Sequence, residues 1–192
     1  MHSDKMFSSI VSSRNVYGFT TKVKSDKRVK SNPEGMDDPV KLYASRGNEY
    51  YVDRKNIEKG IEAIDCYKVY TPFANNIGTD LSDDNINTII GKPGTIATET
   101  YLVIGSNVNL NEKTAGNISR YMKTKFVRFL ISLAKANQNG TQKTYAFVPM
   151  QDFSSSSEIN WNSNNLDEQL YKKYNCSKAE IDYIMTNIAD LK

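Results

Sequence analysis

Apolar side chains recur at three- and four-residue intervals between residues 111 and 137. The set consists of Ala115, Ile118, Met122, Phe126, Phe129, Leu130 and Leu133. This spacing places the side chains on one wide face of an α-helix. Asn111 can cap the start of such a helix, and the acidic Glu112 suits its electropositive first turn. The polar run at 137–140 (NQNG) ends it. The pattern therefore predicts one long amphipathic helix over residues 112–137.

Other stretches of the chain carry strand signals. Residues 40–45 and 49–53 are two short β-type runs, and Arg46-Gly47-Asn48 between them predicts a hairpin turn. Further strands are predicted at residues 64–71, 95–105 and 144–148. The last two flank the long helix, so a strand–helix–strand crossover is possible. We therefore expect an α+β fold, in which a mixed β-sheet is backed by the 112–137 helix.

The character of the chain changes after Met150. Residues 154–157 are all serine, and residues 160–165 (NWNSNN) are almost wholly polar, which is typical of a linker. Two short helices are predicted next, because Asn165 with Glu168 and Ser177 with Glu180 have the spacing of a capping box. We expect a domain over residues 1–150, followed by an appendage over residues 151–192 that contains a polar linker and two helices.

Charge is distributed unevenly along the chain. Residues 1–35 carry seven Lys and Arg against three acids, and residues 111–150 carry seven against one. The segments 36–110 and 151–192 are net acidic. Two basic segments separated by an acidic one favour a positive face for a polyanion such as DNA. Lysines that merely keep the surface solvated are the alternative.

Several classes of protein are disfavoured by the composition. No run approaches 18 consecutive apolar residues, so we expect no membrane span. The N-terminal residues lack the apolar core of a signal peptide. Cys66 and Cys176 are far apart, and His2 is the single histidine, which argues against a zinc site and for a reducing compartment. We expect a cytoplasmic protein.

The exposed side of the predicted helix is the first candidate for binding DNA. At about 100° per residue, Asn117, Arg120, Thr124, Arg128 and Lys135 fall within about 80° of one another, and Lys123 lies beside them. Arginine and asparagine can contact both phosphates and purine edges. A second candidate is a basic loop that suits phosphate contacts and contains Lys22, Lys24, Lys27 and Arg28. Thr98, Glu99 and Thr100 are further possible contacts. An ordinary solvated helix face and a flexible surface loop remain the alternatives.

Catalytic motifs are largely missing. The chain has no glycine-rich cofactor loop, no Asn-Pro-Pro-aromatic or Asp-Pro-Pro-aromatic motif and no Walker-type phosphate loop. Asp53-Arg54-Lys55, with Asp37 or Asp38 upstream, fits the acid-x-Lys pattern of metal-dependent nucleases, but a charged turn after a strand explains it better. Likewise, Asp80, Asp83 and Asp84 are better explained as a solvated acidic loop than as a cation site.

Several blocks, in order, resemble one known family. They are residues 14–19 (RNVYGF), 64–69 (IDCYKV), 90–93 (IGKP), 98–105 (TETYLVIG), 121–130 (YMKTKFVRFL), 147–149 (FVP), 161–174 (WNSNNLDEQLYKKY) and 180–184 (EIDYI). Together they resemble the C-terminal target-recognition region of restriction–modification adenine-specific DNA methyltransferases, in the combined methylase–endonuclease, type IIG-like class. The serine-rich linker is longer and more polar than this family's pattern.

The resemblance implies a function for the chain. It implies sequence-specific recognition of double-stranded DNA, which directs a methyltransferase or endonuclease catalytic domain or subunit to its site. It assigns no cofactor to this chain, because S-adenosylmethionine and Mg²⁺ belong to the catalytic portions that are missing here. Two alternatives stay open. One is a small metal-dependent nuclease that uses Asp53 and Lys55, and the other is a module whose C-terminal helices dock a methylase partner.

Overall fold

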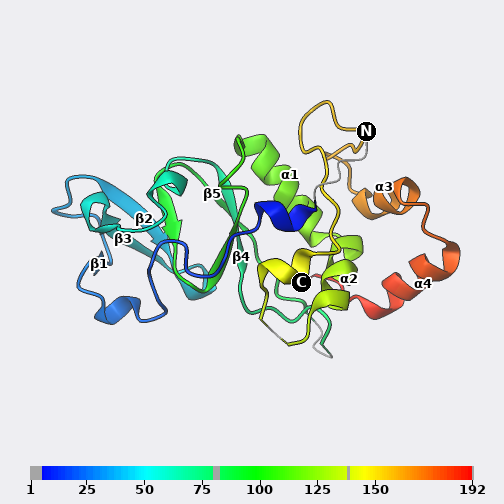
Figure 1. The fold of residues 1–192 in the computed structure, drawn as a ribbon, viewed down its shortest axis with the longest axis horizontal. Helices are drawn as coiled ribbons and strands as arrows, with labels where there is room; N and C mark the ends of the chain where they lie inside the picture. Colours follow the sequence, from blue (N-terminus) through cyan, green and yellow to red (C-terminus); the bar gives the residue numbers. More distant parts are fainter. Residues whose placement is uncertain (1–5, 80–82, 138, 192) are drawn as a thin grey trace.

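The computed structural model describes residues 6–79, 83–137 and 139–191. In Figure 1, strands β1, β2 and β3 lie at one end of the molecule, helices α2, α3 and α4 lie towards the other, and β4 and β5 lie between. The helices of the described residues are α1 (Glu112–Lys123), α2 (Lys125–Ala134), α3 (Leu166–Lys173) and α4 (Lys178–Asn187). The strands are β1 (Val29–Lys30), β2 (Pro39–Tyr43), β3 (Glu49–Asp53), β4 (Lys68–Pro72), β5 (Ile89–Gly91), β6 (Thr95–Ala97) and β7 (Tyr101–Ile104). The combination of helices and a mixed sheet confirms the α+β class.

The strands form two sheets. One sheet has the order β1-β3-β2-β6, in which β6 runs parallel to β2 and the other pairs are antiparallel. The predicted hairpin is confirmed as β2 and β3, with Val40 opposite Val52, and its tip is a 3₁₀ turn at Ser45–Gly47. The second sheet, β5-β4-β7, is antiparallel throughout.

The second sheet separates two hydrophobic clusters. Side chains of β4 and β7 alternate between its faces, as the pleat of a strand requires. Val69, Leu102 and Ile104 belong to the cluster that contains the helices, whereas Tyr70, Tyr101 and Val103 belong to the cluster around β2, β3 and β6. We call these two halves the helical lobe and the strand lobe. Because both faces are covered, every residue from Lys68 to Thr71 is buried.

The predicted 112–137 helix is wrong in one respect, because Thr124 divides it into α1 and α2. The Thr124 backbone is extended, with φ −64° and ψ 148°. Its hydroxyl donates to the Tyr121 carbonyl at 2.7 Å and accepts from the Val127 N–H at 3.2 Å. Threonine is a favourable N-cap, and such local bonds compete with a continuous helix. The sequence pattern located the buried face from Ala115 to Phe126 but not this break, and its last residue, Leu133, is exposed.

Three predicted strands also differ in the structure. The one predicted at residues 64–71 begins only at Lys68, as β4. Residues 95–105 are divided into β6 and β7, which belong to different sheets, by a turn in which the Tyr101 N–H donates to the Thr98 carbonyl at 3.1 Å. Residues 144–148 do not form a strand, because a capping box between Thr141 and Thr144 starts the 3₁₀ turn Gln142–Tyr145 there. The strand–helix–strand crossover is therefore absent from the described residues.

The C-terminal segment contains the two predicted helices but not a free polar linker. Ser177 and Glu180 form the expected capping box at the start of α4, whereas the Asn165 side chain does not cap α3. Phe153, Ile159 and Trp161 are buried in the same cluster as α1 and α2. The Trp161 indole N–H donates to the Asp152 carbonyl at 3.0 Å. The helical lobe therefore contains residues on both sides of residue 150.

His2, used in the argument against a zinc site, and Asp80, part of the predicted acidic loop, lie outside the described residues. Across the described part of the chain, no helix has the length and apolar character needed to cross a membrane.

Candidate nucleic-acid interface

The polar stripe predicted on one helix face is mostly buried in the structure. Asn117, Thr124 and Arg128 are 5%, 5% and 2% exposed, and Lys135 is half-buried. The Asn117 amide donates to the Phe153 carbonyl at 2.8 Å, so the polar segment after residue 150 covers this side of α1. The prediction of a continuous exposed stripe is wrong, because the C-terminal segment and the chain before β5 pack over it. Only Arg120 and Lys123 remain exposed.

Arg128 is the most deeply buried cation of that stripe. Its Nη1 lies 2.5 Å from an Asp84 carboxylate oxygen and 2.6 Å from the Ala189 carbonyl oxygen. Asp84 is itself 3% exposed, so the expectation of a solvated acidic loop is wrong at this position. A buried ion pair whose members are also hydrogen-bonded is a structural feature rather than a surface for DNA.

Lys135 is also bound to protein groups. Its ammonium donates to the Asn75 and Ile77 carbonyls at 2.8 and 3.0 Å and to the Asn75 side chain at 2.6 Å. Burial lowers the pKa of Lys135 to about 8. Arg128 of α2 and Lys135, which follows α2, therefore both bind described parts of the chain between β4 and β5.

The basic loop of the strand lobe is arranged differently. Lys22, Lys24 and Lys27 are exposed, and none of them forms an ion pair with a described residue. Arg28 is anchored, because its guanidinium pairs with Asp26 at 2.7 Å and lies over the Phe19 ring at 4.4 Å. The hydrogen bond from Arg28 also lowers the pKa of the Asp26 carboxyl. Three lysines of this loop are thus available to an anionic partner, whereas Arg28 orders the loop.

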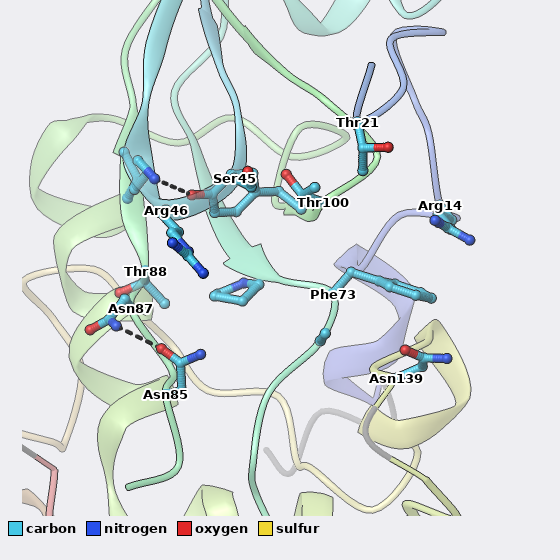
Figure 2. Close-up of a pocket in the computed structure, with 15 residues that line it drawn as sticks. Arg14, Thr21, Ser45, Arg46, Phe73, Asn85, Asn87, Thr88, Thr100 and Asn139 are labelled. Carbon is cyan, nitrogen blue, oxygen red and sulfur yellow. Dashed lines mark hydrogen bonds between the residues drawn. The ribbon is translucent and has the colours of Figure 1, made fainter. Parts of the chain in front are cut away.

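A cleft of about 760 Å³ lies between the hairpin tip, the segment before the basic loop and the chain around β5. Its lining residues are mainly polar: Arg14, Thr21, Ser45, Arg46, Gly47, Pro72, Phe73, Ala74, Asn85, Asn87, Thr88, Ile89, Thr100, Tyr101 and Asn139. Figure 2 shows the Arg46 side chain extending from the hairpin tip toward Thr88 and Asn87. Because Thr21 is a lining residue, the basic loop begins directly at the rim of the cleft.

Backbone conformation distinguishes two residues of the cleft. Arg46 has φ 61° and Asn85 has φ 51°. Asparagine tolerates the left-handed region, but an arginine in it carries a steric cost, and such strain clusters at functional sites. The turn brings the Gly47 N–H to the Tyr101 hydroxyl at 3.1 Å, and it directs the Arg46 side chain over the cleft.

Arg14 lies on the opposite side of the cleft from Arg46 (Figure 2). Its guanidinium pairs with Glu99 at 3.0 Å and lies over the Phe73 ring at 4.5 Å. Glu99 also accepts from the Thr21 N–H at 3.2 Å. Of the three residues 98–100, Thr100 lines the cleft, Glu99 orients Arg14, and Thr98 is buried.

The residues of the nuclease alternative do come together. Lys55 lies 2.6 Å from an Asp37 carboxylate oxygen and 3.4 Å from one of Asp53, and Asp53 also accepts from the Asp37 N–H at 3.0 Å. The lysine thus lies beside both carboxylates, as expected of a charged turn after a strand. Over the described ranges, no group of three or more His, Cys, Asp or Glu side chains could hold a metal ion.

Sequence reasoning did not identify the cleft, because its residues come from six separate segments of the chain. One local signal was available. Arg46 occupies a tight turn before a glycine, where asparagine, aspartate or glycine would be favoured, and a residue that costs stability in a turn is a candidate for function. No known protein family, curated protein or solved structure matches this chain.

Proposed function

We propose that the chain recognises specific sequences in double-stranded DNA, with the cleft and the adjoining basic loop as the binding surface. One observation carries the proposal. Arg46 is held in a strained conformation over a cleft that also contains Arg14 and three asparagine amides, and an unpaired lysine loop begins at its rim.

The two parts of this surface suit different parts of DNA. The lysine ammonium groups of Lys22, Lys24 and Lys27 suit phosphates, which supply affinity that depends on salt but not on sequence. Arginine pairs bidentately with guanine and asparagine with adenine, so Arg46, Asn85 and Asn87 suit base edges. Arg120 and Lys123 stay candidate phosphate contacts on α1, although neither lines the cleft.

The family resemblance supports a role beside a catalytic partner. On this proposal the chain directs an adenine methyltransferase or endonuclease domain or subunit to its site. On the same proposal, S-adenosylmethionine and Mg²⁺ are bound by that partner.

A second candidate function is docking of the partner protein. Tyr183 and Met185 of α4 are more than half exposed, and a groove of about 690 Å³ between α3 and α4 is lined by Tyr171, Ile181 and Met185 among others. Exposed apolar patches of this kind favour protein contacts. Tight binding to a methylase partner, together with weak and unspecific DNA binding, would favour docking over DNA recognition.

The direct test is selection of the purified chain against random duplex DNA at about 50 and 200 mM salt. One enriched motif that persists at the higher salt is the expected result. Binding that is lost with salt and enriches no motif would leave only a basic surface, and would contradict sequence-specific recognition. Mg²⁺-dependent cleavage of the same DNA, lost in Asp53→Ala, would instead establish the nuclease alternative.

Single variants then test whether the base contacts lie in the cleft or on the exposed face of α1. Arg46→Ala is expected to relax preference at one base position, at a cost of about 1–3 kcal/mol in discrimination. Arg120→Ala is expected to weaken binding to all DNA sequences alike, or to leave binding unchanged. Lys178→Ala, an exposed lysine on α4, is the control. Relaxed specificity in Arg120→Ala with none in Arg46→Ala would move the base contacts from the cleft to α1.

A further inference from the structure

The chain between β4 and β5 supplies one wall of the cleft. Asn85, Asn87 and Thr88 lie on it, Asn85 has a left-handed backbone, and the Asn87 amide donates to the Asn85 side-chain oxygen at 2.9 Å (Figure 2). The wall has little regular structure of its own. Its shape therefore depends on bonds to other elements.

Three side chains connect this wall to the helices. Lys135 binds the Asn75 and Ile77 carbonyls at its beginning, and Ser119 is hydrogen-bonded to Thr88 at 2.6 Å at its end. Between them, Arg128 pairs with Asp84, the residue immediately before Asn85. The Asp84 carbonyl also accepts from the Asn76 N–H at 2.9 Å, so Asp84 binds the segment that follows β4 as well as Arg128.

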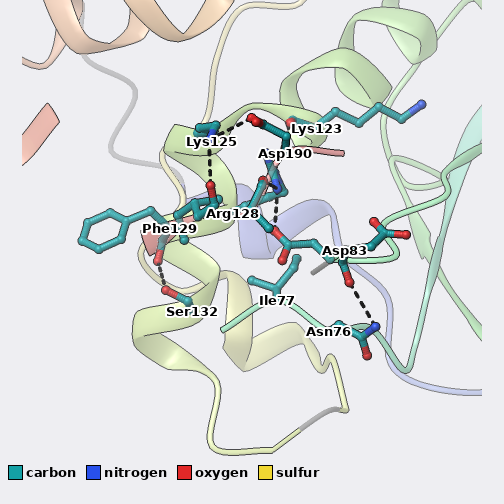
Figure 3. Close-up of polar contacts among 12 residues, drawn as sticks. Asn76, Ile77, Asp83, Lys123, Lys125, Arg128, Phe129, Ser132 and Asp190 are labelled. Carbon is teal, nitrogen blue, oxygen red and sulfur yellow. Dashed lines mark hydrogen bonds and ion pairs between the residues drawn. The ribbon is translucent and has the colours of Figure 1, made fainter. Parts of the chain in front are cut away.

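Arg128 also binds the segment after α4. Its Nη1 donates to the Ala189 carbonyl at 2.6 Å. Beside it, Lys125 donates to the Ile188 carbonyl at 2.7 Å and pairs with Asp190 at 2.9 Å (Figure 3). The segment 188–190 and the wall of the cleft therefore meet at a single buried guanidinium.

We propose that Arg128 is a positioning residue for base recognition. It holds Asp84, and through Asp84 it sets the amides of Asn85 and Asn87, while it makes the segment 188–190 part of the same unit. Arg128 thus determines specificity without touching DNA. This inference rests on the proposed function, since it assumes that Asn85 and Asn87 read bases.

The physical reason is the geometry of bidentate recognition. An amide that pairs with two atoms of a base edge must be held within about 0.5 Å of the productive position. A buried ion pair with extra hydrogen bonds can supply that rigidity, whereas solvated side chains cannot. Displacement of the segment 188–190 would remove one partner of Arg128 and thereby loosen the amides.

The test uses the double variant Asp84→Asn/Arg128→Met. Removing both charges leaves no buried ion unpaired, so this variant is expected to fold where Arg128→Ala could fail. The matched control is Asp65→Asn/Arg54→Met, which removes an ion pair of the strand lobe that does not line the cleft. A third variant, Asn87→Ala, identifies the base positions at which preference depends on this wall of the cleft.

Two measurements are made on these variants. In DNA selection, the double variant is expected to lose preference by about tenfold at the positions marked by Asn87→Ala, with unchanged salt dependence and unchanged affinity for unrelated DNA. In amide hydrogen exchange without DNA, the backbone N–H groups of residues 83–88 are expected to exchange about tenfold faster than in the control.

The outcomes separate the inference from the proposed function. Unchanged base preference and unchanged exchange at residues 83–88 would overturn the role of Arg128. An equal loss at every base position would also overturn it, because that result indicates general loosening. If the wild-type chain selects no motif, the proposed function fails, and the exchange measurement alone decides whether Arg128 orders the wall.

Discussion

The two lobes use the same basic side chains in opposite ways. In the helical lobe, Arg128 is fully buried and binds a carboxylate and a carbonyl oxygen, and Lys135 is half-buried and binds carbonyl and amide oxygens. In the strand lobe, Lys22, Lys24 and Lys27 point to solvent without an ion pair to any described residue. Basic residues of this chain therefore have two different structural roles. Arg128 and Lys135 hold segments of the helical lobe together, whereas Lys22, Lys24 and Lys27 of the strand lobe form no ion pair with a described residue.

The cleft is lined by residues from both lobes. Arg46 belongs to the strand lobe and is exposed, whereas Asn85 and Asn87 lie on a wall that is held by Arg128 of α2 and by Lys135, which follows α2. A surface that must select among DNA sequences needs both rigid base contacts and accessible phosphate contacts. On the proposed function, the wall held by Arg128 would supply the rigid base contacts and the lysine loop the accessible phosphate contacts.

The largest expected difference between the lobes is in stability. Arg128→Ala leaves Asp84 as an unpaired buried carboxylate, and we expect it to lower the free energy of unfolding by about 3–5 kcal/mol. Arg54→Ala removes the partly exposed pairs with Asp38 and Asp65, and we expect a loss of about 1 kcal/mol or less. Urea unfolding at pH 7 measures both. Equal losses in the two variants would remove the distinction between the lobes.

The second prediction concerns affinity for DNA. Replacing Lys22, Lys24 and Lys27 by alanine is expected to lower the slope of log affinity against log salt by about 2.7, since each phosphate contact contributes about 0.9. The matched control replaces Lys143, Lys172 and Lys178, which are exposed and lie away from the strand lobe. Titrations at several salt concentrations measure the slopes. A larger change in the control would place the phosphate contacts on the helical lobe.

Local sequence signals predicted the elements that depend on local chemistry. The β2–β3 hairpin was predicted because a turn tripeptide separates two β-type runs, and α4 because Ser177 and Glu180 form a capping box. The apolar face of the helix region was also predicted, since Ile118 and Met122 are fully buried. In these cases the residues that determine the structure are neighbours in the chain.

Features that depend on distant contacts were not predictable in the same way. The position of Arg128 suggested an exposed face, but the segment 188–190 and Asp84 cover it. Thr124 has a side chain that suits either a helix interior or a cap, and packing of α1 and α2 decides between them. The cleft joins Arg14, Arg46 and residues after 85, which no spacing rule connects.

The third prediction concerns how the free energy of unfolding depends on pH. It tests Lys68, which does not follow the difference between the two lobes. Lys68 is a fully buried cation that belongs to β4, and its ammonium donates to the carbonyls of Ile64, Cys66 and Lys92. Burial lowers the pKa of Lys68 to about 8, whereas the unfolded chain has a lysine pKa of about 10.4. The unfolded chain therefore binds the proton more tightly, and the protonated Lys68 destabilises the folded state. This destabilisation has its full value below pH 8 and decreases as the pH rises toward 10.

We expect the free energy of unfolding to rise by on the order of 1 kcal/mol from Lys68 between pH 7 and 9. Above pH 10 the trend reverses, because burial raises the pKa of Tyr145 to about 12 while tyrosines of the unfolded chain ionise. Denaturant unfolding at pH 7, 8 and 9 measures the rise, and Lys68→Met should reduce it. An identical rise in Lys68→Met would assign the effect to other groups, of which Lys135, with its pKa also lowered to about 8 by burial, is the next candidate.

The smallest effect on stability is expected at the hairpin tip. Arg46 has φ 61° and ψ 26°, a left-handed conformation that asparagine adopts more easily than arginine. Arg46→Asn should therefore raise the free energy of unfolding by about 0.5 kcal/mol. The same change removes the guanidinium from the cleft, so DNA selection should lose preference at one base position while the protein becomes more stable. A gain in stability with loss of specificity would indicate that the strain at Arg46 is retained for binding. If Arg46→Asn bound and selected DNA like the wild type, the hairpin tip would be only a turn, and specificity would have to lie in the wall that Arg128 holds.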